Sequence, residues 1–125
     1  MGMGDERILL IDDAALMRMT IKDILIKHGF KICGEGRDGL EAIEKYRALK
    51  PDLVIMDITM GNMDGLTALK EIIKEFPDAK IIMCSAMGQE SHDIEALESG
   101  AVGFIIKPYQ ADSIISTVIK ALRQN

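Results

Sequence analysis

The stretch Leu53-Val54-Ile55-Met56-Asp57 is an apolar run that ends abruptly in a carboxylate. Four consecutive apolar residues, two of them β-branched, predict a strand that is buried on both faces of a sheet. Asp57 would then lie at the carboxyl end of that strand, where open α/β sheets bind their ligands. Because a lone ionised carboxylate is costly to bury, the rest of the chain should supply a compensating group.

The residues on either side of this stretch repeat its pattern of strand followed by helix. Apolar strand-like runs occur at 8–11, 30–33, 80–84 and 102–106, and helical spacings of apolar residues occur at 14–28, 40–49, 66–76, 91–99 and 112–123. This strict alternation predicts an α/β fold with a parallel sheet and helices on both faces. The fourth helix offers only Ile94 and Leu97 as apolar anchors, so we expect it to be loosely held.

The composition indicates one globular domain over residues 1–125. The chain is 48% hydrophobic and 28% charged, with a formal net charge of -5, which argues against DNA binding and suits a basic partner or a divalent cation. No apolar run approaches the roughly 20 residues of a membrane span, and residues 1–7 lack the features of a signal peptide. Cys33 and Cys84 form no metal-ligand or redox motif, so we expect free thiols and a cytoplasmic protein.

The predicted strands deliver polar groups to a single edge of the sheet. Asp12 and Asp13 follow the first strand, Asp57 ends the third, Ser85 follows the fourth and Lys107 follows the fifth. If the first and third strands are neighbours, about 4.8 Å apart, the three carboxylates crowd together and repel. Mg²⁺ would relieve that repulsion and keep waters for phosphate oxygens, and Lys107 would add a positive charge for the same ligand.

Each of these residues alone has an ordinary structural explanation. An Asp pair before a helix commonly caps it, a Ser after a strand commonly forms a turn, and a Lys is commonly solvated. Their coincidence at the ends of four strands indicates a functional site. The stretch Asp12-Asp13-Ala14-Ala15 contains no glycine-rich loop and would repel a pyrophosphate, which argues against dinucleotide binding.

Four motifs stand at these strand ends: Ile11-Asp12-Asp13, Met56-Asp57-Ile58-Thr59-Met60, Ser85-Ala86 and Lys107-Pro108. A fifth, Met63-Asp64-Gly65, accompanies the second of them in the loop that follows. Together they resemble the receiver domains of two-component response regulators, over nearly the whole chain. The resemblance implies a flavodoxin-like (βα)5 doubly wound sandwich, with a five-stranded parallel sheet of order 2-1-3-4-5. It also implies a cis peptide bond between Lys107 and Pro108.

The resemblance further implies how the acidic residues work. Asp57 would be the phospho-acceptor, a carboxylate nucleophile that forms an aspartyl phosphate in a Mg²⁺-dependent reaction. Asp13 and Asp57 would bind Mg²⁺ directly, together with the backbone carbonyl of Thr59. Asp12 would act mainly through a bound water.

A switch is implied for the remaining site residues. Lys107 would pair with the phosphoryl group, and Ser85 would move toward it and vacate space into which Phe104 turns. As a Phe, residue 104 lacks the hydroxyl that a Tyr would offer to lock the inward position. One departure from the family pattern is Gly61, where a Pro is usual, which predicts a more mobile loop or a close approach of its backbone to a partner.

The stretches 12–19 and 84–90 resemble stand-alone regulators of chemotaxis most closely. The implied protein is a signalling switch rather than an enzyme, catalysing only its own phosphoryl transfer and autodephosphorylation. A CheA-like histidine kinase would supply the phosphoryl group, a motor-switch or adaptor protein would read the result, and a phosphatase would be a further partner. Since residue 125 directly follows the last helix, we expect a monomeric receiver without an output domain.

Two alternatives stay open from the sequence. A receiver that hands its phosphoryl group on to another His protein, as a phosphotransfer intermediate, would have the same site residues. A phosphatase of the haloacid-dehalogenase type would need a second Asp two residues after the nucleophile, where Thr59 stands.

Overall fold

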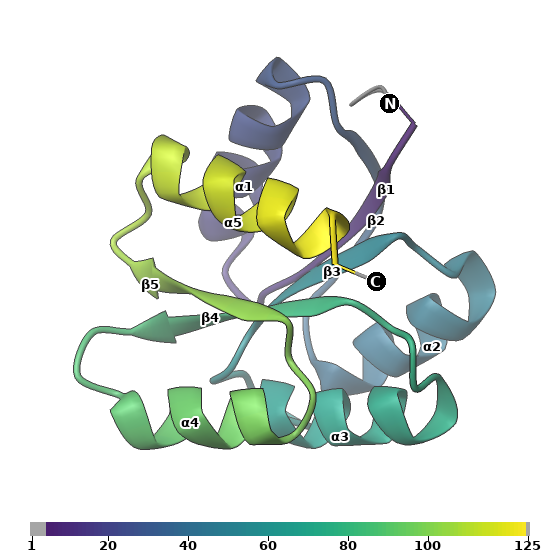
Figure 1. Ribbon diagram of the computed structural model, residues 1–125. Coiled ribbons are helices and arrows are strands. Elements are labelled where there is room, and N and C mark those ends of the chain that lie inside the picture. The colour runs from purple at the N-terminus through teal and green to yellow at the C-terminus, as the bar shows by residue number, and fades with distance from the viewer. Residues whose placement is uncertain (1–4, 125) are drawn as a thin grey trace.

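The computed structural model describes residues 5–124, along which strands and helices alternate (Figure 1). The strands are β1 (Arg7–Ile11), β2 (Lys31–Gly36), β3 (Leu53–Asp57), β4 (Ile81–Ala86) and β5 (Gly103–Lys107). The helices are α1 (Ala15–Lys27), α2 (Gly39–Leu49), α3 (Gly65–Glu75), α4 (Glu90–Glu98) and α5 (Ala111–Leu122). The expected domain also includes residues 1–4 and 125, which lie outside the described residues.

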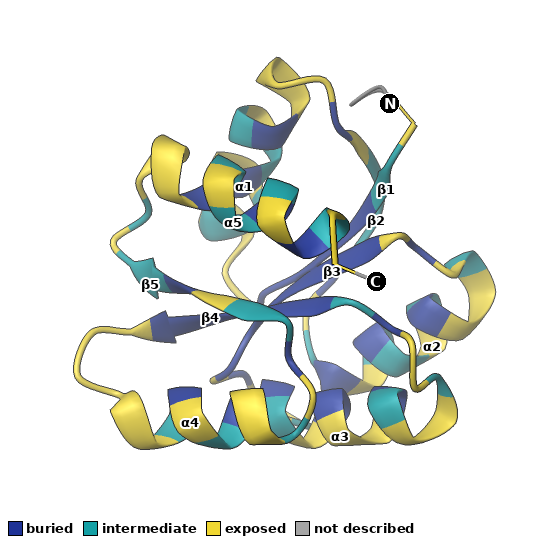
Figure 2. Cartoon of the chain, in the orientation of Figure 1, coloured by how far each residue is buried: buried dark blue, intermediate teal, exposed yellow. Residues whose placement is uncertain are grey.

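All five strands are parallel and follow the order β2-β1-β3-β4-β5, which confirms the expected flavodoxin-like topology. Helices α1 and α5 cover one face of the sheet, and α2, α3 and α4 cover the other (Figure 1). In this order β3 is the central strand. Its five residues are all buried, as its unbroken apolar run predicts, and its carboxyl end lies between those of β1 and β4 (Figure 2).

The sheet divides the hydrophobic core into two clusters. Ile8, Leu10, Leu53 and Ile55 belong to the cluster beneath α1 and α5, and their neighbours along the same strands belong to the cluster beneath α2, α3 and α4. This follows from the alternation of side chains along a strand. The alternation decides which face each strand-end residue inherits.

Strand β2 extends to Gly36, beyond its expected end at residue 33. Gly34 pairs with Leu9, and Gly36 pairs with Ile11. A Cβ atom at Gly34 would lie 2.8 Å from Cδ1 of Leu49, so the glycine lets α2 pack closely on the strand. These glycines therefore serve close packing inside a strand, and the expected strand end at residue 33 was wrong.

The expected anchors of α4 were also wrong. Ile94 is 56% exposed and Leu97 is 45% exposed, whereas the buried residues of this helix are Asp93 and Ala96. The helix turns its small residue toward the sheet, and the outer side of α4 is largely exposed (Figure 2). An alanine buries little apolar area, so α4 gains only modest stabilisation from this contact.

Helices α2 and α3 each begin after an aspartate at the N-cap position. Oδ1 of Asp38 accepts a hydrogen bond from the Glu41 N–H at 2.9 Å, and Oδ1 of Asp64 accepts one from the Thr67 N–H at 2.8 Å, so both residues cap helices. Cys33 and Cys84 are free thiols. Within residues 5–124, every helix is too short or too polar to cross a membrane.

Candidate functional site

The carboxyl ends of β1 and β3 bring three carboxylates together. Asp12, Asp13 and Asp57 each offer an oxygen, and these oxygens lie within 4.8 Å of one another. They converge because β1 and β3 are paired, with Ile11 opposite Met56. Asp12 and Asp57 are buried and Asp13 is exposed, so the cluster is reached from the Asp13 side.

Asp12 is held tightly but incompletely. Its N–H donates to the Gly36 carbonyl at 3.0 Å, and its Oδ1 accepts from the Ala14 N–H at 2.8 Å. Its Oδ2 is buried and has no hydrogen-bond partner among the described residues. Burial raises the pKa of Asp12 above its ordinary value, against the lowering effect of the Ala14 N–H, and the Asp57 charge adds to the rise. The cluster therefore has an unmet need for positive charge.

We expect Asp12→Asn to stabilise the metal-free protein at pH 7. Because the pKa of Asp12 is raised on folding, its protonated form favours the folded state, and stability is lost as the pH rises from the ordinary carboxyl range through the raised value. An amide removes that loss, which we put at about 1 kcal/mol, the lower end for an unpaired buried group. Thermal unfolding in EDTA should show a midpoint higher by roughly 4 °C.

The control for this experiment is Asp13→Asn, which changes an exposed carboxylate of the same cluster. It relieves repulsion without relieving burial, so its midpoint should rise less than that of Asp12→Asn. An Asp12→Asn midpoint at or below the wild-type value would contradict the electrostatic picture of this site.

Lys107 reaches Asp57 across the intervening strand. Its Nζ lies 2.8 Å from Asp57 Oδ2, although β4 separates β3 from β5. Cys84 of β4 stands opposite Asp57 in the register, and Lys107 of β5 stands opposite Ala86 of β4. Burial alone would lower the pKa of Lys107, but the hydrogen bond and charge of Asp57 outweigh it and raise the pKa. Lys107 is thus the compensating group that the buried Asp57 requires.

The second oxygen of Asp57 is much less engaged. Oδ1 has a contact of 3.4 Å with the Thr59 N–H, at the long limit of a hydrogen bond.

Cys84 does not compete with Asp57 as a nucleophile, because burial raises the pKa of its thiol to about 12. Tyr109 also lies close to this thiol, and burial raises its pKa as well. Sequence reasoning missed Tyr109, although its place two residues after Lys107 could have drawn attention to it.

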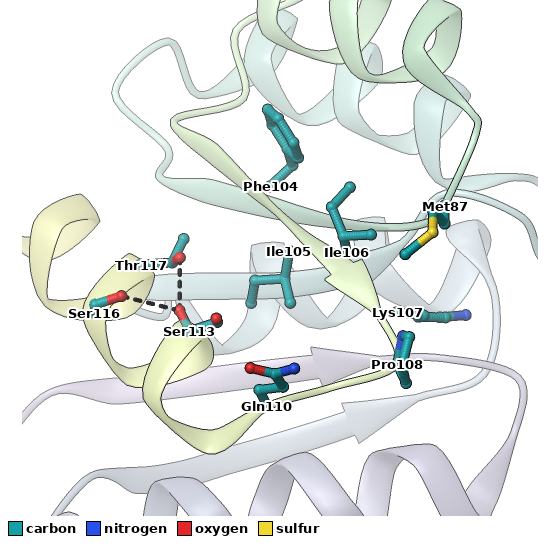
Figure 3. A pocket seen from close by; sticks show the side chains of 10 residues that line it. All are labelled: Met87, Phe104, Ile105, Ile106, Lys107, Pro108, Gln110, Ser113, Ser116 and Thr117. Atoms are coloured by element: carbon teal, nitrogen blue, oxygen red, sulfur yellow. Dashed lines mark hydrogen bonds between the residues drawn. The ribbon is translucent and has the colours of Figure 1, made fainter.

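Ser85 and Phe104 stand in positions compatible with a switch. The Ser85 hydroxyl is buried and finds no hydrogen-bond partner in residues 5–124. Phe104 is 36% exposed and lines a hollow between β5 and α5 together with Met87 and Lys107. Figure 3 shows the Phe104 ring and the Lys107 chain pointing in different directions from β5. Phe104 therefore occupies an outward position in this structure.

The loop after Asp57 is fastened to the start of α2. The Asn62 side-chain amide donates to Asp38 Oδ2 at 2.9 Å, and the Gly39 N–H donates to the Met63 carbonyl at 2.8 Å. A Cβ atom at Gly61 would meet no described atom within 4 Å. Both hydrogen bonds thus restrain the loop just after Gly61, the position where the resemblance leads us to expect a proline.

Arg18 is a second residue that sequence reasoning missed. Its guanidinium donates through Nη1 to the Asp12 carbonyl and through Nε to Glu35 Oε1 at 3.1 Å. Long side chains on a helix point back toward its N-terminus, so an arginine one turn into α1 is placed to reach the preceding loop. That geometric signal is present in the sequence, although it does not say which carbonyl the arginine finds.

The profile of the response regulator receiver domain matches residues 8–119, which include every site residue described above. The chain belongs to this family. Chemotaxis protein CheY of Bacillus subtilis (strain 168) is 57% identical over 116 residues, covering 93% of this chain and 97% of that protein.

Solved receiver structures agree with this assignment. The response regulator domain of Thermotoga maritima CheB has a TM-score of 0.89 at 40% identity, covering 96% of this chain and 98% of that one. CheY in a CheX–CheY–BeF₃–Mg²⁺ complex from Borrelia burgdorferi has a TM-score of 0.91 at 33% identity, covering 95% and 90%. The chain is therefore a receiver domain of a CheY-like response regulator rather than a classical enzyme. Its acidic cluster comprises Asp12, Asp13 and Asp57.

Proposed function

We propose that this receiver domain is a phospho-acceptor switch, which takes a phosphoryl group from a histidine kinase onto Asp57 and then changes its partner binding. The observation that carries the proposal is the Asp57 carboxylate itself. It is buried at the end of the central strand, one of its oxygens is held by Lys107 at 2.8 Å, and two further carboxylates lie beside it. A carboxylate so placed is oriented for attack on one side only.

The donor atoms at the site fit Mg²⁺. Asp13, Asp57 and the backbone carbonyl of Thr59 would bind the ion directly, and Asp12 would act through a bound water. These are hard oxygen donors, which Mg²⁺ prefers, and the unpartnered Oδ2 of Asp12 is an acceptor suited to a coordinated water. When bound, Mg²⁺ neutralises charge on the carboxylates and on the phosphoryl oxygens during transfer.

The chain's own residues then perform the transfer. Asp57 attacks the phosphorus of a phosphohistidine through its less engaged oxygen, Oδ1, and the P–N bond breaks as the P–O bond forms, with the imidazole leaving. Lys107 shifts its ammonium from Asp57 to a phosphoryl oxygen, so this partly buried positive charge keeps a partner throughout. Autodephosphorylation is a separate hydrolysis, in which water attacks the phosphorus of the acyl phosphate, the P–O bond to Asp57 breaks, and inorganic phosphate and the free carboxylate are released.

Ser85 couples this chemistry to a change of surface. Its unpartnered hydroxyl would donate to the phosphoryl group, and its movement would leave room for the Phe104 ring to turn inward. We expect Ser85→Ala to accept phosphoryl groups while its Phe104 ring signals in NMR no longer shift on phosphorylation. Ser91→Ala, at an exposed position in α4, is the matched control and should shift as the wild type does. An unchanged Phe104 response in Ser85→Ala would contradict the coupling.

The relatives support a role in chemotaxis for this switch. The similarity to proteins named chemotaxis protein CheY supports a CheA-like kinase as donor and a motor-switch or adaptor protein as reader, in the cytoplasm. The solved CheX–CheY complex supports a phosphatase as an additional kind of partner.

The proposal is tested with Mg²⁺, acetyl phosphate and intact-mass spectrometry. The wild-type protein should gain the mass of one phosphoryl group, and the gain should vanish when EDTA replaces Mg²⁺. An unaltered mass with bound Mg²⁺ verified by calorimetry would overturn the mechanism. Phosphoryl transfer from a phosphorylated CheA-like kinase tests the pathway, and onward transfer to a second His protein would favour the phosphotransfer alternative.

A further inference from the structure

Behind the acidic cluster lies a network of three charged side chains. Arg18 Nε donates to Glu35 Oε1 at 3.1 Å, and Lys22 Nζ donates to Glu35 Oε2 at 3.0 Å. The same guanidinium donates through Nη1 to the backbone carbonyl of Asp12. The network thus links α1 and β2 to the loop between β1 and α1, which carries Asp12 and Asp13.

The Arg18 side chain is the most buried of the three. Its side chain is 15% exposed, against 33% for Glu35 and 41% for Lys22. Exposed ion pairs contribute little to stability, but a largely buried guanidinium must have its hydrogen-bond donors satisfied. Glu35 and the Asp12 carbonyl satisfy donors on two sides of the same planar group. A guanidinium can hold two acceptors at a fixed angle, which a lysine ammonium cannot.

The loop held in this way has few other restraints. Ala14, the residue that precedes α1, has a methyl side chain that cannot accept a hydrogen bond, so α1 begins without a side-chain cap at this position. Within the described residues, the loop is also held by hydrogen bonds from the Asp12 N–H to the Gly36 carbonyl, from the Ala14 N–H to Asp12 Oδ1, and from the Arg18 N–H to the Ala14 carbonyl. The Asp12 carbonyl is the point at which a side chain from another element takes hold of the loop.

We propose that Arg18 is a positioning residue for the metal site, which is clamped by Glu35 and fixes the Asp12 carbonyl so that the carboxylates of Asp12 and Asp13 face Asp57. The inference rests on the proposed Mg²⁺-dependent function and adds a determinant of its metal affinity. Glu35 serves twice, because it orients the guanidinium and offsets its charge near a site that must attract a cation.

Electrostatics and positioning make opposite predictions for one substitution. Arg18→Gln removes a positive charge beside three carboxylates, so electrostatics alone predicts tighter Mg²⁺ binding. Loss of positioning predicts weaker binding. Arg18→Lys keeps the positive charge but removes the planar guanidinium that holds two acceptors. Electrostatics alone therefore predicts no change in Mg²⁺ affinity, whereas loss of positioning again predicts weaker binding.

The test is calorimetric titration of the full chain with MgCl₂. We expect Arg18→Gln and Arg18→Lys each to weaken Mg²⁺ binding by about tenfold, the lower end of the range for groups that orient metal ligands. The matched control is Arg37→Gln, because Arg37 lines a hollow with Asp13 but pairs only with Glu41 among the described carboxylates. Arg37→Gln should bind Mg²⁺ at least as tightly as the wild type.

A double variant tests whether Glu35 acts through Arg18. Glu35→Gln should weaken Mg²⁺ binding. Adding it to Arg18→Gln should weaken binding no further, because the guanidinium that Glu35 orients is already absent in that variant. Thermal unfolding in EDTA establishes that each variant is folded. If Arg18→Gln does not fold, the single variants Arg18→Lys and Glu35→Gln test the positioning role in its place. Folded Arg18 variants with wild-type or tighter Mg²⁺ binding would overturn the positioning role. A wild-type chain that binds no Mg²⁺ would instead overturn the proposed function.

Discussion

Asp57→Asn should take up no phosphoryl group from acetyl phosphate in the presence of Mg²⁺. The amide is a poor nucleophile, and it removes the only negative charge that holds Lys107 at 2.8 Å among the ion pairs of the described residues. The loss should be complete on the timescale in which the wild type is fully modified. Intact-mass spectrometry measures it directly.

The matched control is Asp64→Asn. Asp64 ends the loop that follows Asp57 and is exposed. It caps α3 by accepting a hydrogen bond from the Thr67 N–H, which an Asn side chain can also do. This variant should gain one phosphoryl group as the wild type does, and hydroxylamine should remove it because an acyl phosphate is labile to that nucleophile. Uptake by Asp57→Asn equal to that of the wild type would place the acceptor elsewhere.

Gly65→Ala should be the most destabilising single-methyl change near the site. A Cβ atom at Gly65 would lie only 2.0 Å from the carbonyl oxygen of Asp57, and 2.9 Å from the Met83 side chain. The Gly65 N–H also donates to the Ile58 carbonyl at 2.7 Å, so the backbone at the start of α3 already contacts the backbone that follows β3. The clash forces α3 away from the end of β3 and displaces the acceptor.

We expect Gly65→Ala to cost about 3 kcal/mol, the upper part of the range for overpacking, and to lower the unfolding midpoint by roughly 10 °C. Phosphoryl uptake by the folded fraction should slow as well. Gly61→Ala is the control, because its added methyl meets no described atom within 4 Å, and its stability should stay the same or rise by a few tenths of a kcal/mol. Equal losses in the two variants, or a Gly65→Ala chain as stable as the wild type, would contradict this account.

The sequence predicted those parts of the molecule that depend on short-range pattern. The run 53–57 identified the central strand because full burial leaves an unbroken apolar signature. The convergence of Asp12, Asp13, Asp57 and Lys107 followed from the common direction of parallel strands. The strand order came from the family resemblance, since alternation of strands and helices permits more than one order.

Other features depend on the packing of whole elements and were out of reach. Ile94 and Leu97 are as apolar as any core residue, yet Ala96 faces the sheet, because the fit of the whole helix against its neighbours decides which side is buried. Arg18 was missed for a related reason. Its two acceptors, Asp12 and Glu35, come from a loop and from a different strand, and periodicity within one helix does not report on either.

The division of the core into two clusters has a consequence for how this chain can change in length. Asp57 shares a face with Leu53 and Ile55, and the face is assigned by odd and even counting along the strand. Inserting one residue within β3 would reverse that parity and present the acceptor to the α2–α4 side, away from Lys107. An insertion or deletion in a connection before a strand leaves the alternation of side chains along that strand unchanged, so it is compatible with the site. A one-residue insertion or deletion inside the strand is not.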